Sequence, residues 1–316
     1  MIVHPLLHDG RLRVEVHPHL LPSIARWLPL VPRDTPAHPS GAVIRILPDD
    51  AAPSARPDAE PTLAMGELDA WVQGERARMH GASGVHGVVA LAEGTAEIRA
   101  PVDGDRAAVA MDLYAAATLS CALLLGRMGR ALAHAAAVAP PGGGAWLLVG
   151  DSRAGKTTTC ANLVNAGWSY LSDDHVVLHR DDEGRVAVEG LPRPFHLDEG
   201  WETGGIVERR GNTDPHQRFP GAWTRTAPLA GLLFPRVDAD APTALSPLAA
   251  PDALSGLLRQ SPWLLADRGA APAVLALLRE AALHPTHRLR LGMDTYAAPA
   301  LLAERLRSLR PASTTG

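Results

Sequence analysis

Apolar and charged residues alternate in the N-terminal third of the chain, a pattern that is typical of β-strands with one buried face. The alternation is clearest at residues 11–16 (RLRVEV) and 42–47 (AVIRIL). Residues 48–61 (PDDAAPSARPDAEP) are rich in proline, alanine and aspartate, which predicts an exposed loop. We therefore expect a strand-rich N-terminal region over residues 1–105, which could bind a substrate, form a dimer contact or complete the core.

A long helix is predicted at residues 111–132 (MDLYAAATLSCALLLGRMGRAL), which are rich in alanine and leucine and lack runs of β-branched residues. Arg127 and Arg130 interrupt its apolar stretch before the stretch reaches the length of a membrane span. We therefore predict a helix that is buried in a protein core and is not a membrane anchor.

The rest of the chain mixes predicted strands and helices. Strand patterns occur at residues 135–139, 145–149, 168–172, 176–179 and 287–291, and helix patterns at residues 273–283 and 298–309. Residues 200–221 are polar, rich in glycine and too irregular for either element, which predicts a mobile loop. The expected fold class is α/β, with α+β as the close alternative, and residues 106–316 are expected to form a second domain.

Composition narrows the classes of function. Hydrophobic residues make up 46% of the chain, charged residues 20%, and the mean hydropathy is −0.01, as in water-soluble globular proteins. The net charge of −4 leaves no basic excess for a nucleic-acid backbone. The two cysteines set no disulfide framework, and residues 1–10 show no charged start followed by an apolar core. These features predict a cytoplasmic protein with neither nucleic acid nor a membrane as its partner.

One motif stands out because it contains the only lysine, Lys156, among 30 lysine and arginine residues. Residues 150–157 (GDSRAGKT) match the pattern G-x-x-x-x-G-K-[ST], between the predicted strand AWLLV and the helix-compatible segment TTTCANLVNAG. In such a P-loop, backbone N–H groups surround polyphosphate, the lysine reaches the β- and γ-phosphates, and the hydroxyl binds Mg²⁺. The alternative is a glycine-rich turn without a ligand, which the flanking strand and helix disfavour.

The turn before the motif brings one histidine into consideration. If residues 135–139 and 145–149 pair antiparallel about Gly142, residue 134 faces residue 150. His134 would then lie beside the P-loop, near the phosphates. The alternative is a histidine that is merely satisfied at the start of a strand.

Asp173 and Asp174 follow the predicted strand at residues 168–172, where a nucleotide site needs a second carboxylate for Mg²⁺ or for the nucleophile. Adjacent residues of a strand face opposite ways, so both can serve one site only if the chain turns there. The alternative is an Asx turn that ends the strand.

Four segments resemble the C-terminal domain of the HPr kinase/phosphorylase family and its HPr-kinase-related relatives. They are LAHAAAVAP, LLVGDSRAGKTT, GWSYLSDDHVVL and EGLPRPFHLDE, between residues 132 and 199, and residues 287–306 show a weaker similarity. The resemblance implies a phosphoenolpyruvate-carboxykinase-like nucleotide-binding fold. It also implies an ATP- and Mg²⁺-dependent kinase that transfers the γ-phosphoryl group to a serine of a protein or peptide.

The same resemblance assigns roles to residues. Asp173 would be the base that accepts the proton of the serine hydroxyl, and Lys156 and His134 would act beside it at the γ-phosphate. Thr157 would hold the metal ion, and Asp174 would assist the metal or the substrate. The nucleotide-binding set would be Gly150, Asp151, Ser152, Arg153, Ala154, Gly155, Lys156, Thr157 and Thr158.

The chain departs from the family at several points. The family usually has glycine in place of Arg153, and the bifunctional enzyme has an acidic residue in place of Thr158. The glycine-rich signature that follows the aspartates in that enzyme has no clear copy here.

Relatives with this shorter signature include kinases of lasso-peptide precursors, so such a precursor is one expected acceptor. A non-catalytic ATP-binding regulator and a kinase of small-molecule hydroxyls remain as alternatives, and homo-oligomerisation stays open.

Overall fold

The computed structural model of this chain describes residues 1–29, 36, 38, 41–49, 56–103, 105–199 and 207–309. Its contacts divide the chain into two compact units. The first unit is Met1–Arg130 with Pro262–Val274, and the second is Ala131–Ser261 with Leu275–Gly316. The boundary expected between residues 105 and 106 differs from this division, because the long helix that follows residue 105 packs within the first unit.

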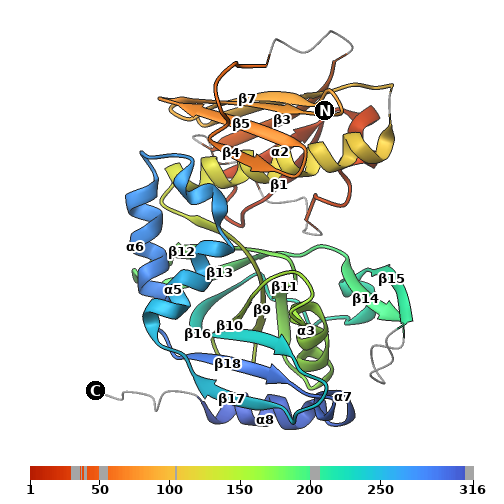
Figure 1. Cartoon of the computed structure of the whole chain (residues 1–316), viewed down its shortest axis with the longest axis vertical. Coiled ribbons are helices and arrows are strands. Elements are labelled where there is room, and N and C mark those ends of the chain that lie inside the picture. The colour runs from red at the N-terminus through yellow and green to blue at the C-terminus, as the bar shows by residue number, and fades with distance from the viewer. Residues whose placement is uncertain are drawn as a thin grey trace. The chain divides into compact units, whose positions relative to one another are not determined.

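The first unit is built on one eight-stranded sheet (Figure 1). Its strands are β1 (Ile2–Pro5), β2 (Leu12–Val16), β3 (Ala42–Pro48), β4 (Leu63–Met65), β5 (Leu68–Gln73), β6 (Arg76–Gly81), β7 (His86–Ala90) and β8 (Thr95–Ala100), in the order β1-β2-β3-β8-β7-β6-β5-β4. Three short helical segments accompany it: η1 (Pro18–Leu20), α1 (Leu21–Ile24) and η3 (Pro262–Leu265). The strand-rich N-terminal region expected from the sequence is confirmed, including the strands at residues 11–16 and 42–47.

Helix α2 (Arg106–Arg127) covers this sheet. Asp105 begins the helix, because its side chain accepts hydrogen bonds from the N–H groups of Ala107 and Ala108. In the part of the chain that is described, α2 alone is long and apolar enough to cross a membrane, and 72% of its most apolar stretch is buried. A mostly buried helix of this kind also occurs in the cores of folded domains, as the sequence analysis expects.

The predicted end of this helix was wrong. α2 ends at Arg127 and not at residue 132, because Gly129 adopts a left-handed conformation (φ +69°) that terminates the helix. The N–H of Arg130 then bonds to the carbonyl of Leu125, and Ala131 already begins a strand.

The second unit contains the other large sheet. Its strands are β9 (Ala131–Ala139), β10 (Ala145–Val149), β11 (Ser169–Ser172), β12 (His175–Arg180), β13 (Val186–Leu191), β16 (Thr226–Val237), β17 (Ala244–Pro247) and β18 (Thr286–Leu291). The main order is β10-β9-β12-β13-β16-β18-β17, β11 pairs with β9, and β10 also pairs with β16. Because β10, β16 and β18 run parallel, their carboxyl ends meet at one edge of the sheet.

Helices and a small ribbon complete the second unit (Figure 1). The helices are α3 (Lys156–Asn165), α4 (Pro215–Arg218), α5 (Ala250–Arg259), α7 (Asp294–Ala297) and α8 (Pro299–Ser308), and α6 (Ala271–Ala281) crosses the boundary between the units. Apolar residues of α3 and α8 form a buried cluster with Trp146, Leu233 and Leu289 of the sheet. This packing holds the start of α3 at the sheet edge where β10 ends.

The predicted loop at residues 200–221 was wrong where the structure describes it. Residues 200–206 lie outside the described part of the chain. Beyond them, β15 (Val207–Thr213) pairs antiparallel with β14 (Phe195–Glu199), and α4 follows. The pairing with β14 forms β15, although the polar sequence of β15 shows no strand pattern. The start of α4 could have been predicted, because Asp214 before Pro215 is a typical helix N-terminus. In the predicted loop at residues 48–61, residues 56–61 form neither helix nor strand, and residues 50–55 are not described.

Mixed α/β architecture, the expected class, is confirmed.

Candidate functional site

The P-loop has the strand–loop–helix context that its sequence predicts. β10 ends at Val149, the loop follows, and α3 begins at Lys156. Gly155 caps the helix with φ +97°, and a Cβ there would lie 2.8 Å from the Leu291 side chain. Only glycine fits this combination of backbone angle and packing. The N–H groups at the start of α3 are therefore presented at the carboxyl edge of the parallel strands, where anions bind favourably.

Lys156 is a buried cation that is held on the loop itself. Its Nζ donates to the carbonyl oxygens of Gly150 (2.7 Å) and Asp151 (3.0 Å). Burial lowers the pKa of Lys156, while the carboxylates of Asp174, Asp151 and Asp173 act in the opposite direction. Phosphate oxygens can take over these two hydrogen bonds, because an ammonium group bonds more strongly to an anion than to a carbonyl.

The hairpin before the P-loop has the register that the sequence predicts. Trp146 pairs with Val138 and Val149 with Ala135, so the same register brings residue 134 opposite residue 150. His134 itself pairs across the sheet with His175 of β12. β9 changes partner at this point, from β12 to β10 and β11.

Asp173 lies against the P-loop hydroxyl. The chain bends at residues 173 and 174, between β11 and β12, so the turn required for both carboxylates to serve one site is present. Thr157 Oγ1 donates to Asp173 Oδ2 at 3.1 Å. The side chain of Asp173 is buried, and its Oδ1 has no hydrogen-bond partner among the described residues. Burial, and next the charge of Asp174, raise the pKa of Asp173 well above its usual value.

Asp174 faces the other way and has different neighbours. Its Oδ2 accepts a hydrogen bond from Arg193 (2.6 Å) and lies 2.7 Å from His175 Nδ1, and its Oδ1 lies 3.4 Å from His134 Nε2. Burial opposes ionisation, but His175, which lies within hydrogen-bond distance, and the charge of Arg193 outweigh it and hold the pKa of Asp174 well below its usual value. Asp174 is therefore ionised at neutral pH.

His134 is a neutral imidazole. Burial is the main cause that lowers its pKa to about 4, and the Lys156 charge adds to this despite the opposing effect of Asp174. Its ring stacks on that of His175, with centroids 5.5 Å apart. The side chain remains 37% exposed, so a ligand can reach it.

Three residues of the site escaped the sequence analysis. Arg193 and His175 hold Asp174, and Gln260 connects two parts of the site. The side-chain amide of Gln260 donates to Asp151 Oδ1 (2.8 Å), and the backbone carbonyl of Gln260 accepts from the backbone N–H of His134 (2.9 Å). Arg193 could have been noticed in the sequence, because it lies between two prolines, whose fixed φ angles restrict the backbone around it. Gln260 had none, since it reaches the loop only through the fold.

The remaining P-loop residues surround this arrangement. Asp151, Ser152 and Arg153 are exposed, and Ala154 and Thr158 are half-buried. Arg153 has φ +66°, the one positive φ outside glycine in the described residues. Left-handed backbone is costly for a residue with a Cβ, so glycine would suit this position better than arginine does.

The residues present fit a magnesium ion. Thr157 and Asp173 offer the oxygen ligands that Mg²⁺ prefers, and the unpartnered Oδ1 of Asp173 is a buried acceptor that a cation would satisfy. The described residues contain no cluster of three or more His, Cys, Asp or Glu that could hold a metal ion by themselves. Mg²⁺ commonly needs no such cluster, because one or two protein ligands, water and substrate phosphates complete its shell.

No family model matches this chain, and no curated protein matches its sequence. Among solved structures, the HPr(Ser) kinase/phosphatase from Coxiella burnetii is similar over 56% of this chain and 97% of that chain, at 10% sequence identity and a TM-score of 0.31. This likeness is too distant to assign any chemistry to the site, so the chemistry is inferred from the site's own residues.

Proposed function

We propose that this protein is an ATP- and Mg²⁺-dependent kinase that transfers the γ-phosphoryl group to a hydroxyl, most plainly a serine, of a protein or peptide. One observation carries the proposal: the P-loop and the bend between β11 and β12 bring a P-loop lysine, a carboxylate on the P-loop hydroxyl and a second, ionised carboxylate into one site. These are the parts that phosphoryl transfer requires, namely positioning of the phosphates, charge stabilisation and orientation of the nucleophile.

The geometry favours a division of labour between the aspartates that differs from the sequence expectation, in which Asp173 is the base. Asp173 bonds to the P-loop hydroxyl, so we assign it with Thr157 to the metal ion. Asp174 is ionised, and its Oδ1 faces His134, so we assign it to the acceptor hydroxyl. When bound, Mg²⁺ would neutralise charge on the β- and γ-phosphates.

The steps at this chain's own atoms follow from these positions. Lys156 moves its hydrogen bonds from the loop carbonyls to phosphate oxygens, and the N–H groups at the start of α3 hold the rest of the polyphosphate. Asp174 Oδ1 orients the acceptor hydroxyl in line with the γ-phosphorus and receives its proton as the new O–P bond forms and the bond to the ADP oxygen breaks. Arg193 keeps Asp174 in place by its hydrogen bond. His134 is neutral, so it places no positive charge beside the phosphoryl group that would oppose its transfer.

The proposed acceptor class is a protein or peptide, with HPr and ribosomal peptide precursors such as lasso-peptide precursors among the candidates. The test is intact-mass analysis of HPr and of any peptide encoded next to the gene, after incubation with the protein, Mg²⁺ and ATP. We expect a gain of one or more phosphoryl groups with the parent and with Asp182→Asn, an exposed control on the turn after β12. Lys156→Ala and Asp174→Asn should give none.

A further comparison separates the two aspartates. Asp173→Asn should lose activity that additional Mg²⁺ partly restores, whereas Asp174→Asn should not respond to Mg²⁺. Tight ATP binding without transfer to any acceptor, small hydroxyl compounds included, would instead favour a nucleotide-binding regulator.

A further inference from the structure

An arginine-lined cavity of about 1170 Å³ opens beside the P-loop, within the second unit. One wall is the P-loop itself, from Gly150 to Ala154, and a second wall is α5. The floor is formed by the ends of β16, β17 and β18. We call this space the arginine cavity; its arginines are Arg153, Arg236, Arg259, Arg288 and Arg290.

Strand register explains how the floor acquires its charge. Arg236 of β16 pairs with Arg290 of β18, and Phe234 pairs with Arg288, so these side chains share one face of the sheet. Leu289, between the two arginines of β18, points to the opposite face and packs in the buried cluster with α3 and α8. The arginine face is exposed and the leucine face is buried. Because apolar and charged residues alternate in β18, one face of this strand packs in the core and the other contributes arginines to the cavity floor.

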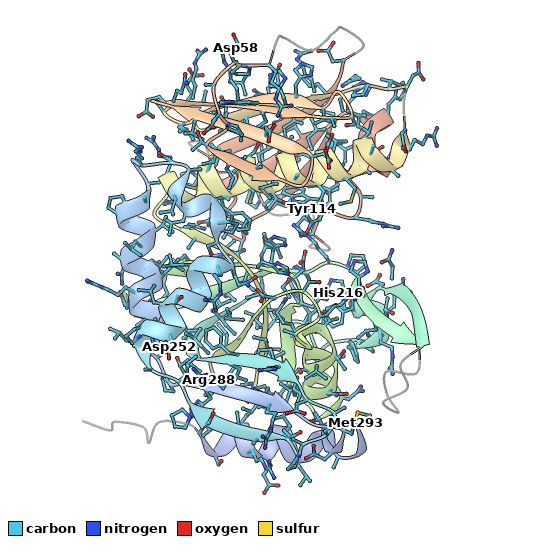
Figure 2. All side chains as sticks on the ribbon, in the orientation of Figure 1. Asp58, Tyr114, His216, Asp252, Arg288 and Met293 are labelled. Carbon is cyan, nitrogen blue, oxygen red and sulfur yellow. The ribbon has the colours of Figure 1, made fainter. Side chains whose placement is uncertain are left out.

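The positive charge of the cavity is not balanced locally. In the described part of the chain one ion pair engages the five arginines, between Arg288 and Asp252 of α5 at 3.6 Å, and Figure 2 shows these two residues on neighbouring elements. The other acidic lining residues are Asp151, which already bonds to Gln260, and Asp238. The chain as a whole carries a net charge of −4, so this concentration of arginine runs against its overall charge. Such a concave positive surface attracts anions.

The cavity adjoins the proposed reaction centre, because Gly150 and Asp151, which accept hydrogen bonds from Lys156, form part of its wall. Gln260 lines it, and the Gln260 carbonyl bonds to the N–H of His134. His134 and Asp174 do not line the cavity, so a ligand held over the arginine floor lies beside the P-loop and next to Gln260. Nucleotide phosphates do not account for the floor, because the P-loop and Lys156 already take them, and a nucleoside has no negative charge for three strand arginines to bind. The volume also exceeds the roughly 300–1,000 Å³ that is typical of small-molecule pockets.

We propose that the arginine cavity binds an acidic segment of the phosphoryl acceptor and so selects acceptors with several carboxylates near the modified hydroxyl. This inference rests on the proposed kinase function, since it names the substrate class for the same site. Asp and Glu side chains of an extended peptide can pair with arginines on adjacent strands, and guanidinium groups suit carboxylates because they bind them with two parallel hydrogen bonds.

The test uses the full-length protein and a fluorescein-labelled oligoglutamate peptide with one serine, with its oligolysine counterpart as the specificity control. The variant is Arg288→Gln/Arg290→Gln, which removes two floor charges outside the P-loop. The matched control is Arg268→Gln/Arg279→Gln, which removes the same charge from exposed positions outside the cavity. Binding is followed by fluorescence anisotropy at low and moderate salt, and MgADP binding is measured in parallel by calorimetry.

We expect oligoglutamate to bind the parent and the control equally, and the floor variant about tenfold more weakly, as the loss of two charge pairs predicts. Binding should also weaken with salt. MgADP affinity should not change in the floor variant. Equal oligoglutamate binding by parent and floor variant would overturn the proposal, and so would a parallel loss of MgADP affinity, which would assign the cavity to the nucleotide. Failure of the parent to bind MgADP would count against the kinase itself, while the peptide arm still reports on the cavity.

Discussion

Asp173 and Asp174 are neighbours in sequence, yet their surroundings move their pKa values in opposite directions. Burial raises the pKa of Asp173, whereas His175 and Arg193 hold that of Asp174 down. Two carboxylates with separated pKa values can take separate roles. The sequence predicted the pair and the need for a bend, both of which the structure bears out. The resemblance to a known family made Asp173 the base, but the sequence could not show that Arg193 holds Asp174, because Arg193 reaches Asp174 only through the fold.

The raised pKa of Asp173 predicts a pH-dependent metal affinity. A carboxyl group whose pKa is raised keeps its proton to higher pH, and Mg²⁺ must displace that proton. We therefore expect the affinity for Mg²⁺, measured with ADP present, to increase as pH rises through the pKa of Asp173, with release of up to about one proton per ion. Calorimetry in two buffers of different ionisation enthalpy measures this release. Asp173→Asn should release none; a release as large as in the parent would assign the proton elsewhere.

Arg153 predicts a gain in stability on substitution by glycine. Its φ of +66° is left-handed backbone, which costs a residue with a Cβ roughly 1–2 kcal/mol. Glycine removes this strain but gains freedom in the unfolded chain, so Arg153→Gly should raise the free energy of unfolding by about 0.5–1 kcal/mol. Arg153→Ala is the control, because it removes the guanidinium and keeps the Cβ. Urea unfolding of both variants checks this, and equal stability of Gly and Ala would show that position 153 is not strained.

At the scale of elements, local pattern was enough for the strand–loop–helix of the P-loop and for the register of β9 with β10. Pattern failed where an element depends on a distant partner. β15 exists through its pairing with β14, and its sequence VERRGNT carries no alternation to reveal it. The end of α2 was readable in principle from Gly129, since glycine just past the last turn is a stop signal.

The packing of β13 against β11 predicts the effect of a single methyl group. A Cβ on Gly190 would lie 2.1 Å from the Leu171 carbonyl oxygen, a backbone atom that cannot move without shifting β11. Gly190→Ala should therefore lower the free energy of unfolding by about 2–3 kcal/mol. It should also weaken MgADP binding, because Leu171 lies just before Asp173.

Gly211→Ala is the control for this variant, because no atom of the described residues lies within 4 Å of its added Cβ. Thermal unfolding and calorimetry are the measurements. Parent-like stability of Gly190→Ala would contradict the close approach of the two strands.

At the scale of the whole molecule, the residues assigned to the proposed site belong to one compact unit that is assembled from two stretches of chain. The intervening segment, Pro262–Val274, joins the first unit, where Asp267 receives two hydrogen bonds from Arg127 of α2 (2.5 and 3.0 Å). The sequence predicted a strand-rich N-terminal part followed by a nucleotide-binding part. The sequence could not predict that residues 262–274 belong to the first unit, because no local pattern indicates the pairing of Arg127 with Asp267.

The central claim is that the P-loop of this chain binds a magnesium nucleotide through Lys156. The most direct measurement is calorimetric titration of MgADP and MgATP into the full-length parent, Lys156→Ala and the exposed control Arg279→Gln, with circular dichroism to show that each is folded. We predict binding by the parent and the control, and a loss of affinity of at least about tenfold in folded Lys156→Ala, since a charge-assisted hydrogen bond contributes about 1.5–3 kcal/mol. Equal binding by parent and Lys156→Ala, or no binding by the folded parent, would contradict the account.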